Sequence, residues 1–405
     1  MENIKTVNRT IPLAFVGMFF FAIGFSLGIN GVLTPVLKES LQISSFESNL
    51  VIAATFLPFV LFSYPASLCI RGVGYKKTMV LAFVLFAIAM ALFIPAVKYE
   101  SFLIFLLASF VCGSGNATLQ TAVNPYITIL GPLESAAQRI SIMGICNKLA
   151  TPTTFVFMAV VVGKSGSELT IADLTTPFII LIACFLVLAI AAYFSPLPEV
   201  KAEGEEEAPK EDTSNSTPAS GGKRLTDFPH LIYGAITLFL YVGVETIAIL
   251  TLGDYARSLG MDNVEALSYV PIIGMVIGYI IGATCIPKIL SQVLAMRLCA
   301  ITAIVGSVLV CVMPPAISVW CLFLLGLGCS LMWPALWPMA IADLGNFTKQ
   351  GSALLAGAIV GGAVIPPLRG LLEDLTGSFQ QSYWICLPCF LFIAWYGFAG
   401  YKIRK

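Results

Sequence analysis

Residues 78–97 read TMVLAFVLFAIAMALFIPAV, a stretch of twenty residues without a charged side chain that lies between Lys77 and Lys98. At about 1.5 Å per residue, a helix of this length crosses a hydrocarbon core of about 30 Å. A bilayer offers no water to the backbone, so a chain that crosses it must satisfy its polar groups internally. The stretch therefore predicts a transmembrane helix.

Apolar runs of similar length recur on both sides of this stretch. We expect spans at 11–36, 49–70, 78–97, 101–129, 138–163, 176–195, 230–256, 264–288, 292–313, 316–342, 351–371 and 381–401. The fold class predicted is an all-α membrane protein with twelve transmembrane helices. An even number of spans places both chain ends on the same side of the bilayer.

Composition agrees with a chain that lives in a bilayer. Of the 405 residues, 58% are hydrophobic and 11% are charged, and the mean hydropathy is +0.92. Soluble domains carry about 25% charged residues, so a soluble enzyme and a secreted disulfide module are excluded. The formal net charge is zero, which leaves no basic surplus for nucleic acid.

The sequence contains few residues that could bind a metal ion or a cofactor. His230 is the single histidine, and the eleven cysteines lie almost entirely in apolar runs, where a free thiol behaves as a small hydrophobe. Cys386 and Cys389 form a CxxC, which we interpret as packing within a membrane segment. We expect no cofactor, no metal site and no enzymatic activity, because no nucleophile–base pair or phosphate loop is present.

The distribution of lysine and arginine predicts the orientation. Sixteen of the 22 lie on the side that holds both termini, five lie on the other side, and Lys148 lies within a span. Because positive charge marks the cytoplasmic side, both termini are expected in the cytoplasm.

Residues 196–229 divide the spans into two groups of six. This segment contains Glu205-Glu206-Glu207 and then a stretch rich in Ser, Thr, Gly and Pro, which predicts a disordered cytoplasmic linker. The domains predicted are a six-helix bundle at 1–195 and another at 230–405. Asn124-Pro125 in the fourth span aligns with Trp337-Pro338 in the tenth, as a six-plus-six duplication requires. This pattern is typical of the major facilitator fold, whose substrate site lies near mid-membrane between the halves.

Two ionisable residues fall near mid-depth of their spans. Glu245 lies about fifteen residues into the seventh span and Lys148 about ten residues into the fifth. Ionisable groups inside a membrane are costly and usually functional, so both are candidates for contact with a substrate or a coupling ion. The alternative is a structural pair that holds the two halves in one conformation.

The uncharged candidates for contact with a substrate are amide and indole side chains. Gln120 and Asn124 are four apart and share one face of the fourth span, and an amide offers both donors and an acceptor to a hydroxylated ligand. Trp333 and Trp337 are also four apart, and aromatic faces stack on sugar rings and on cations. Ordinary packing remains the alternative for the two tryptophans.

Several motifs carry a resemblance to a known family. They are LQTAVNPYITILGP at 119–132 with Arg139 and Asn147, YVGVE at 241–245, TKQGS at 348–352, AIVGG at 358–362, and Asn30 with the LTP at 33–35. Together they resemble the fucose–galactose–glucose symporter family of the major facilitator superfamily, in its glucose/galactose branch. The resemblance implies import of a monosaccharide with a proton or sodium co-substrate, in a bacterial inner membrane. Nothing in the sequence calls for an oligomer, so we expect a monomer.

The departures from that family concern its carboxylates. The Asn-Asp pair of its first span matches Asn30-Gly31, and the fourth-span carboxylate of fucose carriers matches Gln120. In the fifth span Asn147 is retained and Lys148 is added. The predicted site residues are listed here: for substrate, Asn30, Gln120, Asn124, Asn147, Lys148, Glu245, Trp333 and Trp337; for coupling or gating, Glu245, Lys148, Arg71, Lys76 and Lys77.

Arg71, Lys76 and Lys77 lie in the short loop between the second and third spans. The loop resembles the basic motif of the superfamily without its acidic residue, and it is predicted either to assist conformational switching or to act only as a topology signal. Two other functions stay open: transport of an anionic solute, such as a sugar acid, recognised by Lys148, and a membrane sensor that transports nothing.

Overall fold

The structure, a computed structural model, describes residues 10–404 except 44, 165–168, 199–223 and 262–266. In these ranges it consists of helices and connecting turns, and no strand occurs among them. The helices of the first half are α1 (Thr10–Leu41), α2 (Ser45–Phe56), α3 (Pro58–Lys98), α4 (Phe102–Ile129), α5 (Ala136–Val162) and α6 (Thr175–Phe194).

Among the residues that the structure describes after the linker region, ten helices occur. They are α7 (Pro229–Leu250), α8 (Leu252–Ser258), α10 (Val270–Cys285), α11 (Gln292–Val312), α12 (Pro315–Ser330), α13 (Met332–Ile341), α14 (Thr348–Ala358), α15 (Gly361–Thr376), α16 (Phe379–Ser382) and α17 (Cys386–Phe398). Short 3-10 turns join them, such as η3 (Ile171–Leu174) and η6 (Tyr383–Ile385).

The number of membrane spans matches the prediction of twelve. Ten stretches of the described chain are long and apolar enough to cross a bilayer. One of them, Leu50–Lys98, counts for two, because α3 alone has 41 residues and would extend about 60 Å as a straight helix. It turns at Gly74, whose φ of 86° and ψ of 170° are not helical. The shorter apolar helix α10 supplies the remaining span.

Four spans of the second half are interrupted, although the sequence predicted each of them as one run. The seventh is divided at Thr251, the tenth at Leu331, the eleventh at Ile359–Val360 and the twelfth at η6. The break at Leu331 has a physical cause. Gly326 and Gly328 weaken the helix before it, and Pro334 removes a backbone donor after it.

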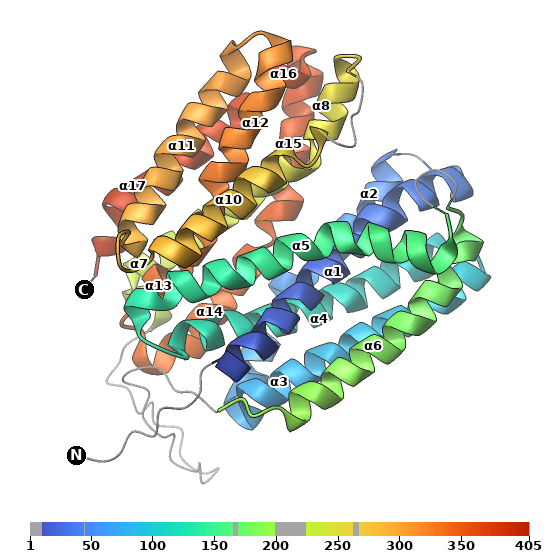
Figure 1. Ribbon diagram of the computed structural model, residues 1–405, viewed down its shortest axis with the longest axis horizontal. Helices are drawn as coiled ribbons and strands as arrows, with labels where there is room; N and C mark the ends of the chain where they lie inside the picture. The colour runs from blue at the N-terminus through green and yellow to red at the C-terminus, as the bar shows by residue number, and fades with distance from the viewer. Residues whose placement is uncertain (1–9, 44, 165–168, 199–223, 262–266, 405) are drawn as a thin grey trace. The chain divides into compact units, whose positions relative to one another are not determined.

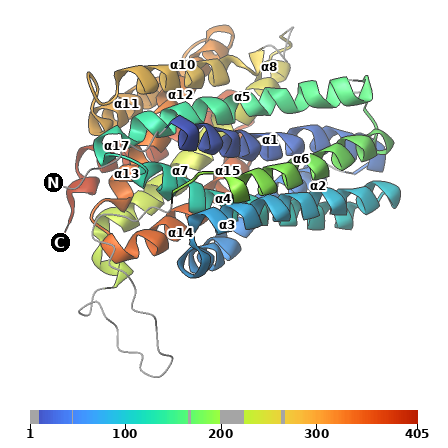
Figure 2. The same cartoon turned by 60° about the horizontal axis from the view of Figure 1, so that its bottom comes forward.

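The chain forms two compact units. One comprises the described residues of Met1–Ile127, Gln138–Glu199 and Tyr279–Cys285; the other comprises those of Thr128–Ala137, Val200–Gly278 and Ile286–Lys405. In the first, α3 and α6 run side by side (Figure 1 and Figure 2), and the rings of Phe93 and Phe178 stack between them with centroids 4.7 Å apart. In the second, α11 and α12 pack together. Most of the predicted linker at 196–229 lies outside the described residues.

Candidate functional site

Helix α5 fastens α1 through side chains that donate to backbone carbonyls. Asn147, a predicted substrate residue, donates its Nδ2 to the carbonyl oxygen of Phe20 at 3.1 Å. Two turns later, the Thr154 hydroxyl lies 3.2 Å from Phe25 O and 3.2 Å from Ala150 O of its own helix. Gly24 makes the approach close, because a Cβ there would collide with the Asn147 carbonyl oxygen. Asn147 therefore has a structural role on α1 whatever else it binds.

The opposite side of α1 meets α4 and α2 through polar side chains. Asn116 on α4 donates its Nδ2 to the Ser26 hydroxyl at 2.8 Å, and the Thr55 hydroxyl on α2 lies 3.3 Å from Asn30 Oδ1. All four residues are at least nine-tenths buried. Of these, only Asn30 was predicted as a site residue. The four-residue spacing of Ser26 and Asn30 is the signal that could have added the others.

The two amides predicted on α4 differ in their surroundings. Gln120 is 7% exposed and Asn124 is fully buried. Asn124 donates its Nδ2 to Gln120 O at 2.9 Å, inside its own helix and next to Pro125. Part of the hydrogen-bonding capacity of Asn124 is thus used to support the backbone beside a proline. Contact of either amide with a substrate stays a prediction.

Lys148 and Glu245 are half-buried residues on different helices and in different units. Lys148 lies on α5, directly after Asn147, and Glu245 lies on α7. Both helices are candidate membrane spans. Partial burial on such helices fits groups that meet a polar ligand in a membrane interior. Pairing of the two stays a prediction.

An aromatic cluster, Tyr241, Trp333 and Trp337, lies where α7 meets α13. The ring of Tyr241 is 6.3 Å from that of Trp333, and the Trp333 and Trp337 rings are 5.4 Å apart at an interplanar angle of 31°. Trp337 is fully buried, and its indole N–H has no hydrogen-bond partner among the described residues. Glu245 follows Tyr241 by four residues and so shares its face of α7.

The predicted switching loop is attached to the end of α6. Lys76 donates its Nζ to the carbonyl oxygen of Ser195 at 2.6 Å, which is the C-cap residue of α6. A cation at a helix C-terminus is electrostatically favourable. Arg71 and Lys77 are exposed.

Two further contacts, which the sequence did not predict, lie at the same end of the first unit. Tyr126 donates its hydroxyl to Pro198 O at 2.9 Å, so the chain that follows α6 is attached to α4. Arg139 is 8% exposed and donates its Nε to Ile127 O at 2.9 Å. Arg139 belongs to the family motif, which was the available signal.

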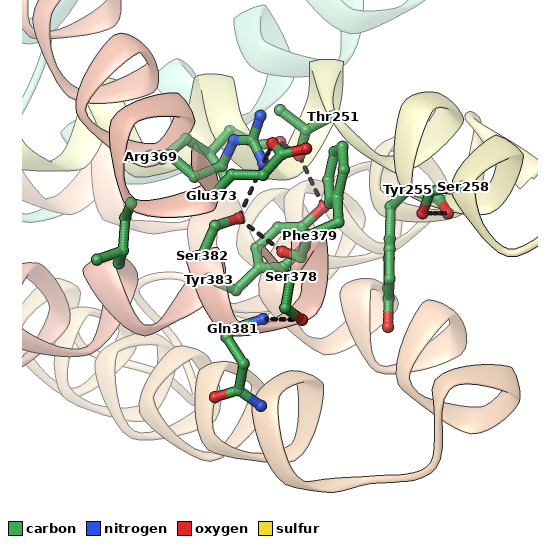
Figure 3. Close-up of polar contacts among 12 residues, drawn as sticks. Thr251, Tyr255, Ser258, Arg369, Glu373, Ser378, Phe379, Gln381, Ser382 and Tyr383 are labelled. Carbon is green, nitrogen blue, oxygen red and sulfur yellow. Dashed lines mark hydrogen bonds and ion pairs between the residues drawn. The ribbon is translucent and has the colours of Figure 1, made fainter. Parts of the chain in front are cut away.

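A second polar cluster joins α15 to the chain that follows it (Figure 3). Arg369 contacts Glu373 Oε2 and the Ser382 hydroxyl, each at 2.9 Å, and its guanidinium lies 4.3 Å from the centre of the Phe379 ring. Thr251 and Tyr383 share a hydrogen bond of 2.7 Å between their hydroxyls. These contacts tie the end of α7 to α15, α16 and η6.

Helix α8 is attached at the same end. The Tyr255 hydroxyl donates to the Ser318 hydroxyl oxygen at 3.0 Å. Asp254 and Arg257 form an exposed ion pair at 2.8 Å. At the other end of the unit Asp343 pairs with Arg404.

Metal-ligating groups do not gather in the described part of the chain. No group of three or more His, Cys, Asp or Glu there could hold an ion. All eleven cysteines are free thiols, and Cys386 and Cys389 are buried. His230 is buried with its Nε2 at 2.8 Å from Ala342 O, in the manner of a core histidine.

Twelve apolar spans with half-buried charges and interior amides define a multi-pass integral membrane transporter. The model of the Major Facilitator Superfamily matches residues 14–354. A glucose/galactose transporter of Brucella abortus is 31% identical over 414 residues, which cover 99% of this chain and 97% of the relative. The chain therefore belongs to the Major Facilitator Superfamily and, within it, to the fucose–galactose–glucose symporter family.

More distant relatives agree. The L-fucose-proton symporter of Escherichia coli K12 is 25% identical over 413 residues, covering 95% of this chain and 91% of that protein. The crystal structure of FucP, a major facilitator transporter in the outward conformation, superposes with a TM-score of 0.82 at 23% identity. The superposition covers 96% of this chain and 98% of FucP, and it demonstrates the major facilitator fold.

Proposed function

We propose that this protein carries a monosaccharide across the bacterial inner membrane by alternating access. The observation that carries the proposal is Trp333 in the second half, which is half-buried and packs on the fully buried rings of Tyr241 and Trp337. Aromatic faces cover the apolar face of a sugar ring, and such stacking is a common means of holding one. The names of the relatives, glucose/galactose transporter and L-fucose-proton symporter, support the same substrate class.

The first half would supply the hydrogen bonds to the sugar hydroxyls. Asn30, Gln120, Asn124 and Asn147 all carry carboxamides, which donate and accept and so match a hydroxyl group. Gln120 and Asn30 keep slight exposure, each at 7%, whereas Asn124 has none. We therefore rank Gln120, Asn30 and Asn147 above Asn124 as substrate contacts.

The same proposal includes the arrangement of the chain in the membrane. Both termini lie in the cytoplasm, because sixteen of the 22 basic residues fall on the side that holds them. The protein works as a monomer, since one chain already provides both halves of a major facilitator. The substrate is contacted by residues of both halves.

Glu245 would govern coupling to a proton. It is the acidic side chain that the sequence places at mid-depth, and ionisable groups inside a membrane usually mark ion pathways. The alternative is a gate in which Glu245 pairs with Lys148 in one conformation and separates from it in the other. The proton named for the Escherichia coli relative favours the coupling hypothesis.

A flux experiment tests the proposed substrate class. Purified protein in proteoliposomes is supplied with labelled D-glucose, D-galactose, L-fucose or D-gluconate, with and without a proton gradient. We expect exchange of at least one neutral sugar and its accumulation when a gradient is imposed. Exchange of gluconate alone would replace the proposal by the anionic candidate, and no flux of any solute would contradict both.

Glu245→Gln separates coupling from gating. Under coupling, the variant keeps passive exchange and loses gradient-driven accumulation, because the amide cannot take up a proton. Under gating, Lys148 loses its partner at a cost of about 3–5 kcal/mol, and both thermal stability and exchange fall. Unchanged accumulation would remove Glu245 from coupling altogether.

Anion transport is kept as a second candidate because of Lys148. It is half-buried on a candidate span, where an ammonium group favours a negatively charged ligand. Lys148→Met should abolish gluconate exchange under this candidate and should leave galactose exchange largely intact under the first.

A further inference from the structure

The corner where α1, α2 and α4 meet holds four buried polar side chains, Ser26, Asn30, Thr55 and Asn116, which make two contacting pairs and are called the circuit here. Ser26 and Asn30 are one turn apart on α1, and Ser26 contacts Asn116 on α4. Gly113, three residues before Asn116, packs so closely on α2 that a Cβ would collide with the Thr55 carbonyl oxygen. Thr55 in turn contacts Asn30. The four side chains therefore surround one small region of the first unit.

Hydrogen-bond acceptors outnumber donors in this circuit. Ser26 donates its only hydroxyl proton to Ile23 O at 2.8 Å, so its oxygen can only accept from Asn116 Nδ2. That contact fixes the orientation of the Asn116 carboxamide, because a flipped amide would bring two acceptor oxygens together. Asn116 Oδ1 is then left buried without a donor among the described residues.

The Thr55 hydroxyl leaves a second buried acceptor without a hydrogen-bond donor. Its single hydroxyl proton has two candidate acceptors, Val51 O at 3.0 Å and Asn30 Oδ1 at 3.3 Å, and it can serve only one of them. The shorter contact is the ordinary bond of a threonine to the preceding turn of its helix. A buried acceptor that lacks a donor costs about 1–3 kcal/mol, so two in one place call for an occupant.

We propose that a sodium ion binds here, coordinated by Asn116 Oδ1 and Asn30 Oδ1 with the hydroxyl oxygens of Ser26 and Thr55. Uncharged oxygens are suitable ligands for a hard cation, and transporters coordinate sodium with carbonyl oxygens. The circuit contains no carboxylate, so a divalent ion would leave two uncompensated charges inside the membrane. The close approach at Gly113 brings the backbones of α2 and α4 together beside these ligands.

The site would couple the ion to the substrate, and this part rests on the proposed function. Asn30 is both a proposed ligand of the ion and a proposed substrate residue, and it lies on α1. An ion that holds α1 against α2 and α4 fixes Asn30 in place, so sodium and sugar each raise the affinity for the other. The ion would thereby supply a coupling route in a chain whose first and fourth spans lack the family's carboxylates.

The binding test uses purified full-length protein in detergent. Its thermal unfolding is followed while sodium chloride replaces choline chloride at constant ionic strength, with potassium chloride as a second comparison. We expect sodium to raise the unfolding temperature in a saturable manner. Asn116→Leu should weaken the apparent sodium affinity by at least about tenfold, and Asn116→Asp should strengthen it, because a carboxylate adds the missing charge.

Ser109→Ala is the matched control. Ser109 lies two turns before Asn116 on α4, is equally buried, and its hydroxyl has no hydrogen-bond partner among the described residues, but it stands outside the circuit. This variant should keep the sodium response. Equal behaviour of wild-type protein in sodium, potassium and choline would overturn the proposal and leave water as the occupant. An unchanged response in both Asn116 variants would overturn it as well.

Sugar exchange in proteoliposomes keeps the two proposals apart. A sodium response without exchange of any sugar would retain the ion site and contradict the proposed function. Sugar exchange without a sodium response would retain the proposed function and contradict the ion site. If Asn116→Leu fails to fold, Asn116→Asp decides, because tighter sodium binding is expected only at a cation site.

Discussion

Helix α1 runs from Thr10 to Leu41 without interruption, whereas the tenth span is divided at Leu331 into α12 and α13. Polar side chains hold α1 on two sides, with Asn147 donating from α5 and Asn116 from α4. The divided span instead carries Trp333 and Trp337, whose rings pack against each other, and Trp333 also packs on Tyr241 of α7. In these two spans, the first half uses polar side chains to hold a continuous helix, and the second half presents aromatic rings on a divided one.

This difference implies that the two halves contribute differently to sugar binding. Carboxamides give direction-dependent hydrogen bonds, and losing one to a ligand costs about 1–3 kcal/mol. Aromatic contacts are less directional and contribute about 0.5–1.5 kcal/mol each beyond their buried area. We therefore expect the first half to determine which sugar is recognised and the second half to add affinity for sugar rings in general.

Interrupted helices need not be loosely packed, and glycine substitutions test this in both halves. A Cβ at Gly361 would collide with Phe239 O, and one at Gly24 would collide with Asn147 O. Gly361→Val and Gly24→Val should each cost about 3 kcal/mol or more, because backbone has to move. Thermal unfolding of purified protein measures the loss.

Gly370→Val is the control for that pair, since nothing lies within 4 Å of a Cβ at Gly370. It should unfold close to the wild-type temperature. If Gly361→Val were tolerated while Gly24→Val was destabilised, the helices of the second half would be loosely packed. That result would contradict the claim that interrupted helices pack as tightly as continuous ones.

Asn147→Ala addresses the specificity assigned to the first half. Removing one buried hydrogen bond to the substrate should lower sugar affinity by ~5- to 150-fold. Thr154→Val is the matched variant, because Thr154 joins the same two helices through Phe25 O and is not a predicted substrate residue. Equal losses in both variants would assign the effect of Asn147 to the position of α1.

Trp333→Ala addresses the affinity assigned to the second half. Loss of one stacking contact should lower sugar affinity by ~2- to 12-fold, and Trp333→Phe should restore most of it. Trp320→Ala provides the reference, because Trp320 on α12 is 55% exposed and lies outside the aromatic cluster. Binding of D-galactose and L-fucose should fall by similar factors, in contrast to the sugar-dependent losses expected for Asn147→Ala.

The smallest change in affinity is expected at Lys76. Its bond to Ser195 O attaches the loop after the second span to the end of α6, away from the substrate residues. Lys76→Met should slow exchange while the equilibrium affinity for sugar stays within about twofold. Lys77→Met, at an exposed position, serves as its control. A large loss of affinity with normal exchange would contradict a role in switching.

The number and type of spans could be predicted because the bilayer allows few solutions. Apolar length alone specifies a helix there, and basic residues at the run ends separate one span from the next. The interruptions at Leu331 and Ile359–Val360 were not predicted. Pro125 and Pro152 lie inside α4 and α5, which stay continuous, so a proline in the sequence does not by itself locate a break.

The candidate site was predictable in its residue types and not in its contacts. Gln120 and Asn147 stood out as amides in apolar runs, but the bond of Asn147 to Phe20 O depends on how α5 packs on α1. Ser26 and Thr55 passed unnoticed, because one hydroxyl in a helix usually bonds to its own backbone. Their importance emerges only when three helices bring them to Asn30 and Asn116.

The central claim is that one sugar contacts both halves of the chain, and tryptophan fluorescence tests it most directly. In a protein with Trp320, Trp384 and Trp395 replaced by Phe, emission comes from Trp333 and Trp337, both in the second half. We predict a saturable change in emission on addition of D-galactose or D-glucose. Asn147→Ala, in the first half, should shift its midpoint to ~5- to 150-fold higher sugar concentration. No change in emission at sugar concentrations that saturate transport would contradict the claim.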